Sequence, residues 1–199
     1  EIRPRDWSSD VCSSDLFKNT ETAIASARAG NVIGGGDWAE DRLIPDIVRS
    51  LSQGKQIIIR NPKATRPWQH VLEPLSGYLL LGKLLYEKGQ EFAEAWNFGP
   101  SDSSVMTVEE IVKKSIEIWG SGSYVVDSSE QPHEANLLKL DVSKAEWKLG
   151  WHSKIDTKEA IMSTIDWYLK FETQQNSKNP VVMKEFSEAQ LGELMRNKY

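Results

Sequence analysis

A run of small apolar residues that ends in a glycine-rich segment constrains the fold of this chain more than any other feature. Residues 23–29 read Ala-Ile-Ala-Ser-Ala-Arg-Ala, and residues 30–36 read Gly-Asn-Val-Ile-Gly-Gly-Gly. The first pattern is typical of a buried parallel strand, and ligands of α/β proteins bind where such strands end. We therefore expect an α/β fold with a ligand site close to residue 30.

Patterns of helix and strand alternate along the rest of the chain. Helices are expected at 43–51, 75–86, 108–119, 143–149, 157–171 and 181–198. Short apolar runs predict strands at 57–59, 68–71, 95–99, 124–126 and 137–140. Thr107 is expected to cap one helix, and Asp156 or Thr157 the next long one. Arg66 falls between two strand-like runs and is expected in a loop.

Composition and charge exclude several kinds of protein. The 199 residues carry a net charge of −5, and basic residues are interspersed with acidic ones, so no surface for nucleic acid is expected. No apolar run approaches the roughly 18 residues of a membrane-spanning helix. Cys12 is the only cysteine, which excludes an internal disulfide framework and fits a reducing compartment. We expect a globular protein of the cytoplasm.

The first residues of the sequence differ from the rest. Residues 1–16 show neither helical nor strand periodicity, and residues 6–16 can be encoded, in frame, by the end of a common sequencing adapter. We interpret 1–16 as non-native sequence; the alternative is a natural arm rich in serine and aspartate. Residues 176–199 are expected to form a linker and a terminal helix, which leaves 17–175 as the folded part.

The glycines and arginines are the candidate ligand-binding residues. Gly30 and the glycines at 34–36 match neither the dinucleotide fingerprint nor a P-loop. They allow a backbone that lies close against a flat ligand ring, or they form a plain turn. A diphosphate requires converging planar donors, which the arginines of four separate segments could supply: Arg28, Arg42, Arg60 and Arg66. Arg66, beside a proline and a tryptophan, is the strongest of these candidates.

The histidines are not expected to bind a metal, and the aromatic residues are expected to have structural roles. His70, His133 and His152 lack the spacing of metal ligands and have no cysteine nearby, so no metal site is expected. His152 follows a tryptophan and is expected to be structural. Five aromatic residues fall at packing positions and are expected in the core: Trp96, Phe98, Trp119, Trp147 and Trp151.

Three stretches of the sequence together resemble the extended short-chain dehydrogenase/reductase family, also called the NAD-dependent epimerase/dehydratase family. They are residues 27–46, which contain Ala-Arg-Ala-Gly-Asn-Val-Ile-Gly-Gly-Gly-Asp-Trp; residues 59–74, with Ile-Arg-Asn-Pro and Arg-Pro-Trp-Gln-His-Val-Leu-Glu-Pro; and residues 132–136, Pro-His-Glu-Ala-Asn. Within the family, the match is most specific to the dehydratases of CDP-glucose. The resemblance implies the C-terminal part of such a protein, with an incomplete parallel sheet of a Rossmann-type domain and a small α/β substrate-binding domain.

The resemblance also implies a reaction and its site residues. In the family's dehydratases, bound NAD oxidises C4 of the sugar, water leaves across C5 and C6, and the hydride returns to C6, giving CDP-4-keto-6-deoxy-glucose. The implied cofactor contacts are Ala29, Gly30 and Val32, which would face the nicotinamide. The implied contacts with the CDP-sugar are Asn31, Arg42, Leu43, Ile58, Arg60, Arg66 and His133.

The residues that carry the family's chemistry are not found in this sequence. No tyrosine is followed four places later by lysine, as the family's catalytic pair requires, so no catalytic residue is assigned and this chain alone is expected to be inactive. Two alternatives remain open: a sister epimerase, reductase or decarboxylase of nucleotide sugars, and a non-catalytic module that binds nucleotide sugars. The resemblance implies a homodimer or homotetramer for the whole protein.

Overall fold

A computed structural model describes residues 17, 19–101, 104–127, 139–175 and 183–198 and has an α/β fold. Its strands are β1 (Ser26–Ala29), β2 (Asn31–Ile33), β3 (Ile57–Ile59), β4 (Thr65–Arg66), β5 (Trp68–His70), β6 (Ala95–Phe98), β7 (Met106–Thr107) and β8 (Tyr124–Val126). Its α-helices are α2 (Leu43–Ser52), α3 (Leu72–Lys88), α4 (Val108–Trp119), α5 (Thr157–Gln175) and α6 (Met183–Lys198). Two shorter helical segments are η1 (Gly89–Phe92) and η3 (Ala145–Leu149).

The described strands pair two by two, and most pairs are parallel. β1 pairs with β6, β2 with β5 and β3 with β8, all in parallel, whereas β4 and β7 are antiparallel. Parallel pairing requires a long crossover between partners, and the segments that connect these strands contain helices. The small parallel sheets agree with the α/β fold that the sequence predicts.

The chain changes partners between β1 and β2, at Gly30. The Gly30 N–H donates to the carbonyl of Phe98, and the next N–H, that of Asn31, donates to the carbonyl of Pro67. A Cβ on Gly30 would overlap that Pro67 carbonyl, so only glycine allows the two segments to come this close. One prediction for this region was wrong: β1 is only half-buried, with Ala27 and Arg28 exposed. Residues 31–33, within the glycine-rich segment, form a further short strand.

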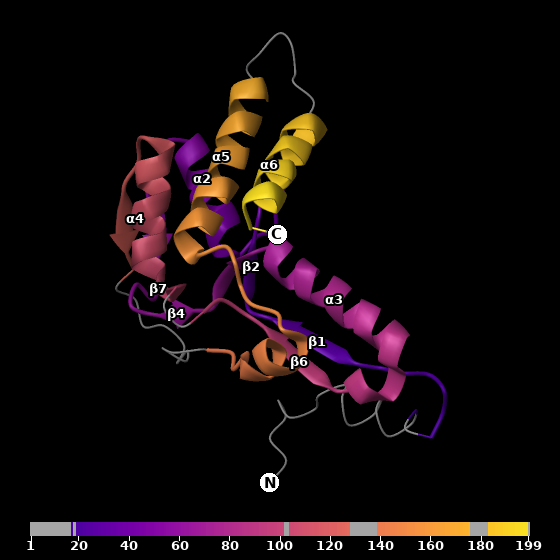
Figure 1. Cartoon of the computed structure of the whole chain (residues 1–199). Helices are drawn as coiled ribbons and strands as arrows, with labels where there is room; N and C mark the ends of the chain where they lie inside the picture. The colour runs from indigo at the N-terminus through magenta and orange to yellow at the C-terminus, as the bar shows by residue number, and fades with distance from the viewer. Residues whose placement is uncertain (1–16, 18, 102–103, 128–138, 176–182, 199) are drawn as a thin grey trace.

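The main core lies between α2, α4 and α5 and the strands β2, β3 and β5. Figure 1 shows α2, α4, α5 and α6 gathered at one end of the molecule, while α3 runs alongside β1 and β6. Helix α2 turns one strongly apolar face inward, as its sequence predicts. The buried members of this core are Ile33, Ile44, Ile47, Val48, Leu51, Ile57, Ile59, Trp68, Ile111, Val112, Ile155, Ala160, Ile161, Ile165 and Tyr168.

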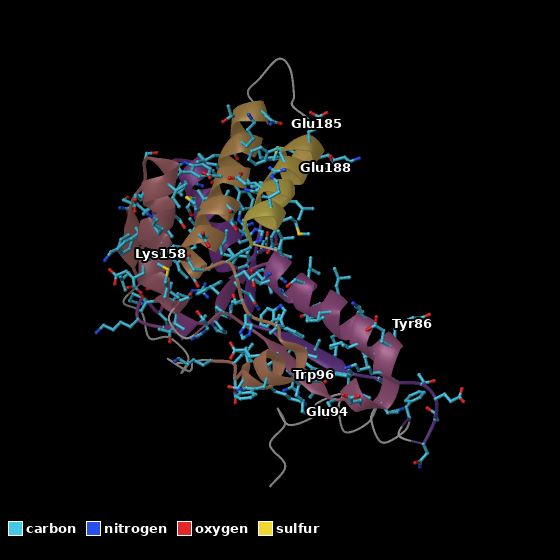
Figure 2. All side chains as sticks on the ribbon, in the orientation of Figure 1. Tyr86, Glu94, Trp96, Lys158, Glu185 and Glu188 are labelled. Atoms are coloured by element: carbon cyan, nitrogen blue, oxygen red, sulfur yellow. The ribbon has the colours of Figure 1, made fainter. Side chains whose placement is uncertain are left out.

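A second, smaller core lies between α3, β6 and η3. It contains Trp96, Phe98 and Trp151, which confirms the prediction that these aromatic residues are buried. Lys144 covers Trp96, with its Nζ 4.5 Å from the ring centroid, and Figure 2 shows Glu94 close by at the same edge of the molecule. Trp119 packs against the main core, as predicted.

Two of the predictions for this region were wrong. Trp147 is 90% exposed. His152, expected to be structural, is exposed on the surface, with its Nδ1 3.7 Å from a carboxylate oxygen of Glu146.

The helix ends follow the capping signals in the sequence. The Thr107 hydroxyl accepts the N–H of Glu110, and the Glu110 carboxylate accepts the N–H of Thr107, which together form a capping box. Asp156 and Glu159 exchange the same pair of bonds at the start of α5. Helix α3 begins earlier than predicted, at Leu72, because Pro74 falls in its first turn, where no backbone N–H is needed.

The C-terminal part of the chain adds one packed helix. The indole N–H of Trp167 on α5 donates to the hydroxyl of Ser187 on α6, at 2.9 Å, and the side chain of Gln190 donates to the carbonyl of Ser163. Residues 1–16 and 176–182 lie outside the described residues, as does the first half of the strand expected at 137–140; the described 139–140 form no strand. Within the described part of the chain, no helix combines the length and the hydrophobicity that a bilayer crossing requires.

Candidate functional site

An open groove of about 1340 Å³ runs between β2, the beginning of α2, the end of β3 and β4. Such a volume is sufficient for a ligand larger than a nucleotide. Ten residues were assigned to ligand binding from the sequence; His133 lies outside the described residues, and of the other nine all but Ala29 line this groove. The eight are Gly30, Asn31, Val32, Arg42, Leu43, Ile58, Arg60 and Arg66.

Two assigned residues are not among the eight: one does not line the groove, and the other lies outside the described residues. Ala29 is the last residue of β1 and does not line it. His133 and the Pro-His-Glu-Ala-Asn motif lie outside the described residues. The roles assigned to the other eight residues stay predictions, because their position in one groove shows that they can share a ligand but not which ligand it is.

Strand β2 forms the floor of the groove at one end. Because side chains of a strand alternate between its faces, Val32 is 38% exposed while Ile33 beside it is buried. Next to it on β5 lies Trp68, whose side chain is buried and whose indole Nε1 has no hydrogen-bond partner within the described part of the chain. This end of the groove is therefore mainly apolar.

The beginning of helix α2 forms a second wall. Arg42 is its N-cap residue, and no side chain caps the helix at that end. The first backbone N–H groups of a helix carry a partial positive charge, so this end of α2 favours an anion. The Arg42 guanidinium adds a full charge there and forms an ion pair with Asp37, at 3.0 Å.

The third wall comes from β3, β4 and the segment that connects them. Ile58 is 67% exposed and Arg60 follows at the end of the strand. Arg66 lies in β4 and not in a loop, because Thr65 and Arg66 pair with Thr107 and Met106. The loop prediction for Arg66 was therefore wrong: a strand of two residues has no periodicity that a sequence can display. This pairing holds the Arg66 backbone in place, and its guanidinium donates to the carbonyl of Thr65, at 2.9 Å.

The charges of the groove favour an anionic ligand that also has an uncharged part. Two of its basic residues are matched by carboxylates: Arg42 by Asp37 and Arg49 by Asp46. Among the residues that the structure describes, the Arg60 and Lys55 side chains make no hydrogen bond or ion pair, whereas the Lys55 backbone N–H donates to the carbonyl of Ser50. Among the same residues, no cluster of histidines, cysteines and carboxylates could hold a metal ion.

The glycine-rich segment has a different neighbour from the one expected. A Cβ on Gly35 would overlap the indole ring of Trp167 from α5, and Gly36 has a φ of 85°. The backbone therefore lies close against a flat ring, but that ring belongs to the chain itself. Of the two readings of these glycines, the turn agrees with the turn conformation at residues 35–36, and contact with a ligand stays a prediction.

Several residues of the groove were missed in the sequence. They are Asp37, Asp41, Arg49, Lys55, Trp68 and Asp127. Trp68 has the pattern of a core residue, and the charged ones have the pattern of ordinary surface residues. The one available signal was the spacing of Arg42 and Arg49, which are seven places apart and so lie on one face of a helix.

Comparisons with known proteins agree with this fold. No family model matches the sequence. The chain is 55% identical over 153 residues to CDP-glucose 4,6-dehydratase of Salmonella typhimurium, covering 76% of this chain and 43% of the relative. Among solved structures, dTDP-glucose 4,6-dehydratase of Bacillus anthracis in complex with NAD is similar at a TM-score of 0.66 and 22% identity, over 82% of this chain and 50% of that one.

A third similar protein is an epimerase. UDP-glucose 4-epimerase of Stenotrophomonas maltophila, with bound NAD and formylated UDP-arabinopyranose, has a TM-score of 0.69 at 17% identity, over 82% of this chain and 53% of that one. The two solved structures show the fold alone. The chain spans less than half the length of the dehydratase relative and about half of the two solved structures.

Proposed function

The chain resembles CDP-glucose 4,6-dehydratase and has the Rossmann-type fold of the extended short-chain dehydrogenase/reductase family, and we propose that it is the nucleotide-sugar-binding part of such a dehydratase. The whole protein would convert CDP-glucose to CDP-4-keto-6-deoxy-glucose and water. One observation carries the proposal: eight residues assigned from the sequence, which come from separate segments, line one groove.

The groove offers chemistry that suits a nucleotide sugar. Arg66 supplies a guanidinium group, which can bind phosphate oxygens in a planar, two-pronged geometry, and Arg60 and Arg42 add two more guanidinium donors to the groove. The exposed side chain of Ile58 offers an apolar contact to a base or ribose, and the Asn31 amide can both donate to and accept from sugar hydroxyls. We assign the diphosphate to Arg66 and the nucleotide side to Arg42, Leu43, Ile58 and Arg60.

Residues around β2 fit part of an NAD site. The N–H groups of Gly30 and Asn31 already donate to Phe98 and Pro67, so these two groups are not available to a cofactor. Val32, half-exposed on the groove, offers an apolar side chain, and such a contact suits a nicotinamide ring. Bound NAD would supply the reversible hydride transfer of the reaction.

The residues of this chain have a binding role in that proposal. They would hold the diphosphate and the sugar in place, which lowers the entropic cost of reaching the reactive geometry. Because no tyrosine in the sequence is followed by lysine four places later, we propose that the catalytic pair belongs to the rest of the protein. We also propose a cytoplasmic homodimer or homotetramer, which the mass of the complete protein in solution would test.

Calorimetry tests the binding role directly. The chain is titrated with CDP-glucose, UDP-glucose and dTDP-glucose, and we expect CDP-glucose to bind at least about tenfold more tightly than the other two. Equal affinities would contradict the cytidine preference. A folded chain that binds none of the three would overturn the proposal.

Turnover by the complete protein separates the dehydratase from its sisters. With CDP-glucose and NAD, a dehydratase forms a product lighter by one water and leaves the NADH concentration unchanged, because the same hydride is returned. The epimerase fold similarity keeps a sister enzyme as the second candidate. An epimerase would give a product of unchanged mass, and a reductase would change NADH in proportion to product.

A further inference from the structure

The segment that joins β2 to α2 includes residues 37–41, which are held by side chains from the two helices α5 and α2. The Tyr168 hydroxyl, on α5, donates to the carbonyl of Asp37, at 2.6 Å. The Arg49 guanidinium, on α2, donates to the carbonyls of Trp38 and Ala39, at 3.0 and 3.2 Å. Three successive carbonyls of this segment are therefore fixed by side chains.

The same segment ends at Arg42, one of the basic residues of the groove. One Asp37 carboxylate oxygen accepts the N–H of Ala39, and the other accepts the guanidinium of Arg42, at 3.0 Å. Asp41, which directly precedes Arg42, has a φ of 60°, a conformation that costs free energy for any residue except glycine. A backbone in this conformation requires support from its surroundings, and Tyr168 and Arg49 hold residues 37–39 of the same segment.

Contacts between aromatic rings stabilise the position of residues 37–41. The Trp38 ring contacts Tyr168 and Phe171 of α5, with centroid distances of 5.2 and 5.1 Å. Tyr168 is fully buried, and burial raises the pKa of its hydroxyl to about 12, so the group keeps its proton and donates at any physiological pH. The hydroxyl is thus a fixed donor, aimed at one carbonyl.

We propose that Tyr168 is a positioning residue for ligand binding: by holding Asp37, it fixes the direction in which Arg42 presents its guanidinium to the nucleotide side of a nucleotide sugar. This inference rests on the proposed function. Tyr168 does not line the groove, so it acts through Asp37 and Arg42 and not by contact with the ligand. Arg42 is two-thirds exposed, and without the Asp37 contact its side chain would sample many directions.

A double-mutant cycle with CDP-glucose tests the proposal. The variants are Tyr168→Phe, which keeps the ring and removes only the hydroxyl, Arg42→Ala, and the two combined. We expect Tyr168→Phe to raise the Kd about threefold to tenfold, the range of one hydrogen bond. In the Arg42→Ala background, Tyr168→Phe should not raise the Kd further, because the guanidinium through which Tyr168 acts on the ligand is absent.

A second tyrosine serves as the matched control. Tyr124 on β8 donates its hydroxyl to Glu109 on α4, at 2.6 Å, and neither residue lines the groove. Tyr124→Phe removes a comparable bond and should leave the Kd unchanged. Should Tyr168→Phe fail to fold, Asp37→Asn replaces it in the cycle, since it keeps the acceptor for the Ala39 N–H and removes the ion pair with Arg42.

The outcomes distinguish the positioning role from the proposed function. A merely structural role for Tyr168 predicts a lower Tm and the same fold-change in Kd with or without Arg42, and that additivity would overturn the proposal. An unchanged Kd for Tyr168→Phe, with a wild-type chain that binds CDP-glucose, overturns the positioning role alone. A wild-type chain that does not bind CDP-glucose overturns the proposed function and the positioning role with it.

Discussion

The indole ring of Trp167 occupies the space in which a side chain at Gly35 would lie. An ideal Cβ on Gly35 would be 2.6 Å from Cδ1 of the ring and still closer to Cγ. The ring cannot easily move aside, because it stacks on Phe171 at a centroid distance of 5.6 Å and donates its N–H to Ser187. The absence of a side chain at residue 35 is therefore a condition for packing the segment that follows β2 against α5.

A methyl group at residue 35 should destabilise the protein. We expect Gly35→Ala to lower the free energy of unfolding by about 1–3 kcal/mol, the usual cost of overpacking a core. The matched control is Gly82→Ala in α3, where no atom lies near the added Cβ and the change should stabilise by up to about 1 kcal/mol. Urea unfolding measures both, and a Gly35→Ala variant as stable as the wild type would refute the contact.

A buried carboxylate connects two distant parts of the chain. Glu73, at the start of α3, is fully buried and accepts the backbone N–H groups of Lys154 and Ile155, at 3.0 and 2.9 Å. Glu73→Ala would leave buried donors without an acceptor and should cost about 2–5 kcal/mol. Glu73→Gln keeps one acceptor oxygen and should cost less than Glu73→Ala.

An exposed glutamate on the same helix provides the control for Glu73. At the surface, the Glu87 Oε1 lies 3.8 Å from the Lys83 Nζ. Glu87→Ala should therefore change the free energy of unfolding by no more than about 0.5 kcal/mol. Chemical denaturation of Glu73→Ala, Glu73→Gln and Glu87→Ala measures the free energy of unfolding of each variant and so the order of their stabilities. If Glu73→Ala and Glu87→Ala destabilise equally, the two backbone bonds to Glu73 do not hold the 154–155 segment.

Strong local signals explain which parts of the fold could be predicted. Helix α2 was predictable because its apolar residues repeat at the helical period, and α4 because Thr107 and Glu110 form a capping box within four residues. Trp147 was misplaced because η3 has only five residues, too few to set the phase of an inward face. The strand β4, with two residues, exists only through its pairing with β7, which lies far along the chain.

The candidate site likewise contains residues that the sequence could identify and supporting residues that it could not. Asn31, Arg42, Arg60 and Arg66 were found through motifs that resemble a family, and the groove brings them together. The partners that support them could not be found, because the bond of Tyr168 to Asp37 and the packing of Trp167 on Gly35 join segments that are distant in sequence. Tertiary contacts of this kind leave no period and no spacing in the residues themselves.

Stability should depend on pH through His70. Burial lowers the pKa of His70 from 6.5 to about 4, and its Nδ1 accepts the N–H of Leu72, which requires the neutral ring. Between these two values the unfolded chain binds the proton and the folded chain does not, so stability falls as the pH falls. From pH 7 to pH 5 the loss should be about 2 kcal/mol.

Substitution of His70 should flatten this dependence. Unfolding free energies of His70→Gln, measured at pH 7 and pH 5, should differ by about 2 kcal/mol less than those of the wild type. His152→Gln is the control, because that ring is exposed and its loss should leave the slope as it is. If the unfolding free energy of His70→Gln depended on pH as strongly as that of the wild type, a group other than His70 would cause the pH dependence.

Arg60 offers the cleanest separation of binding from stability. It is exposed, it lines the groove, and it makes no hydrogen bond or ion pair with the residues that the structure describes. Arg60→Ala therefore removes no internal contact and should leave the Tm unchanged. If the guanidinium binds the nucleotide side of CDP-glucose, the Kd should rise about tenfold, the value of one charge-assisted hydrogen bond.

Arg196→Ala is the matched control for Arg60, since it removes the same charge from α6, where no groove residue lies. Calorimetry with CDP-glucose and a thermal melt on each variant give the two readouts. A loss of affinity in both variants would indicate a general effect of net charge, which added salt would abolish. An unchanged Kd for Arg60→Ala would remove Arg60 from the ligand site and leave Arg66 and Arg42 as its cationic residues.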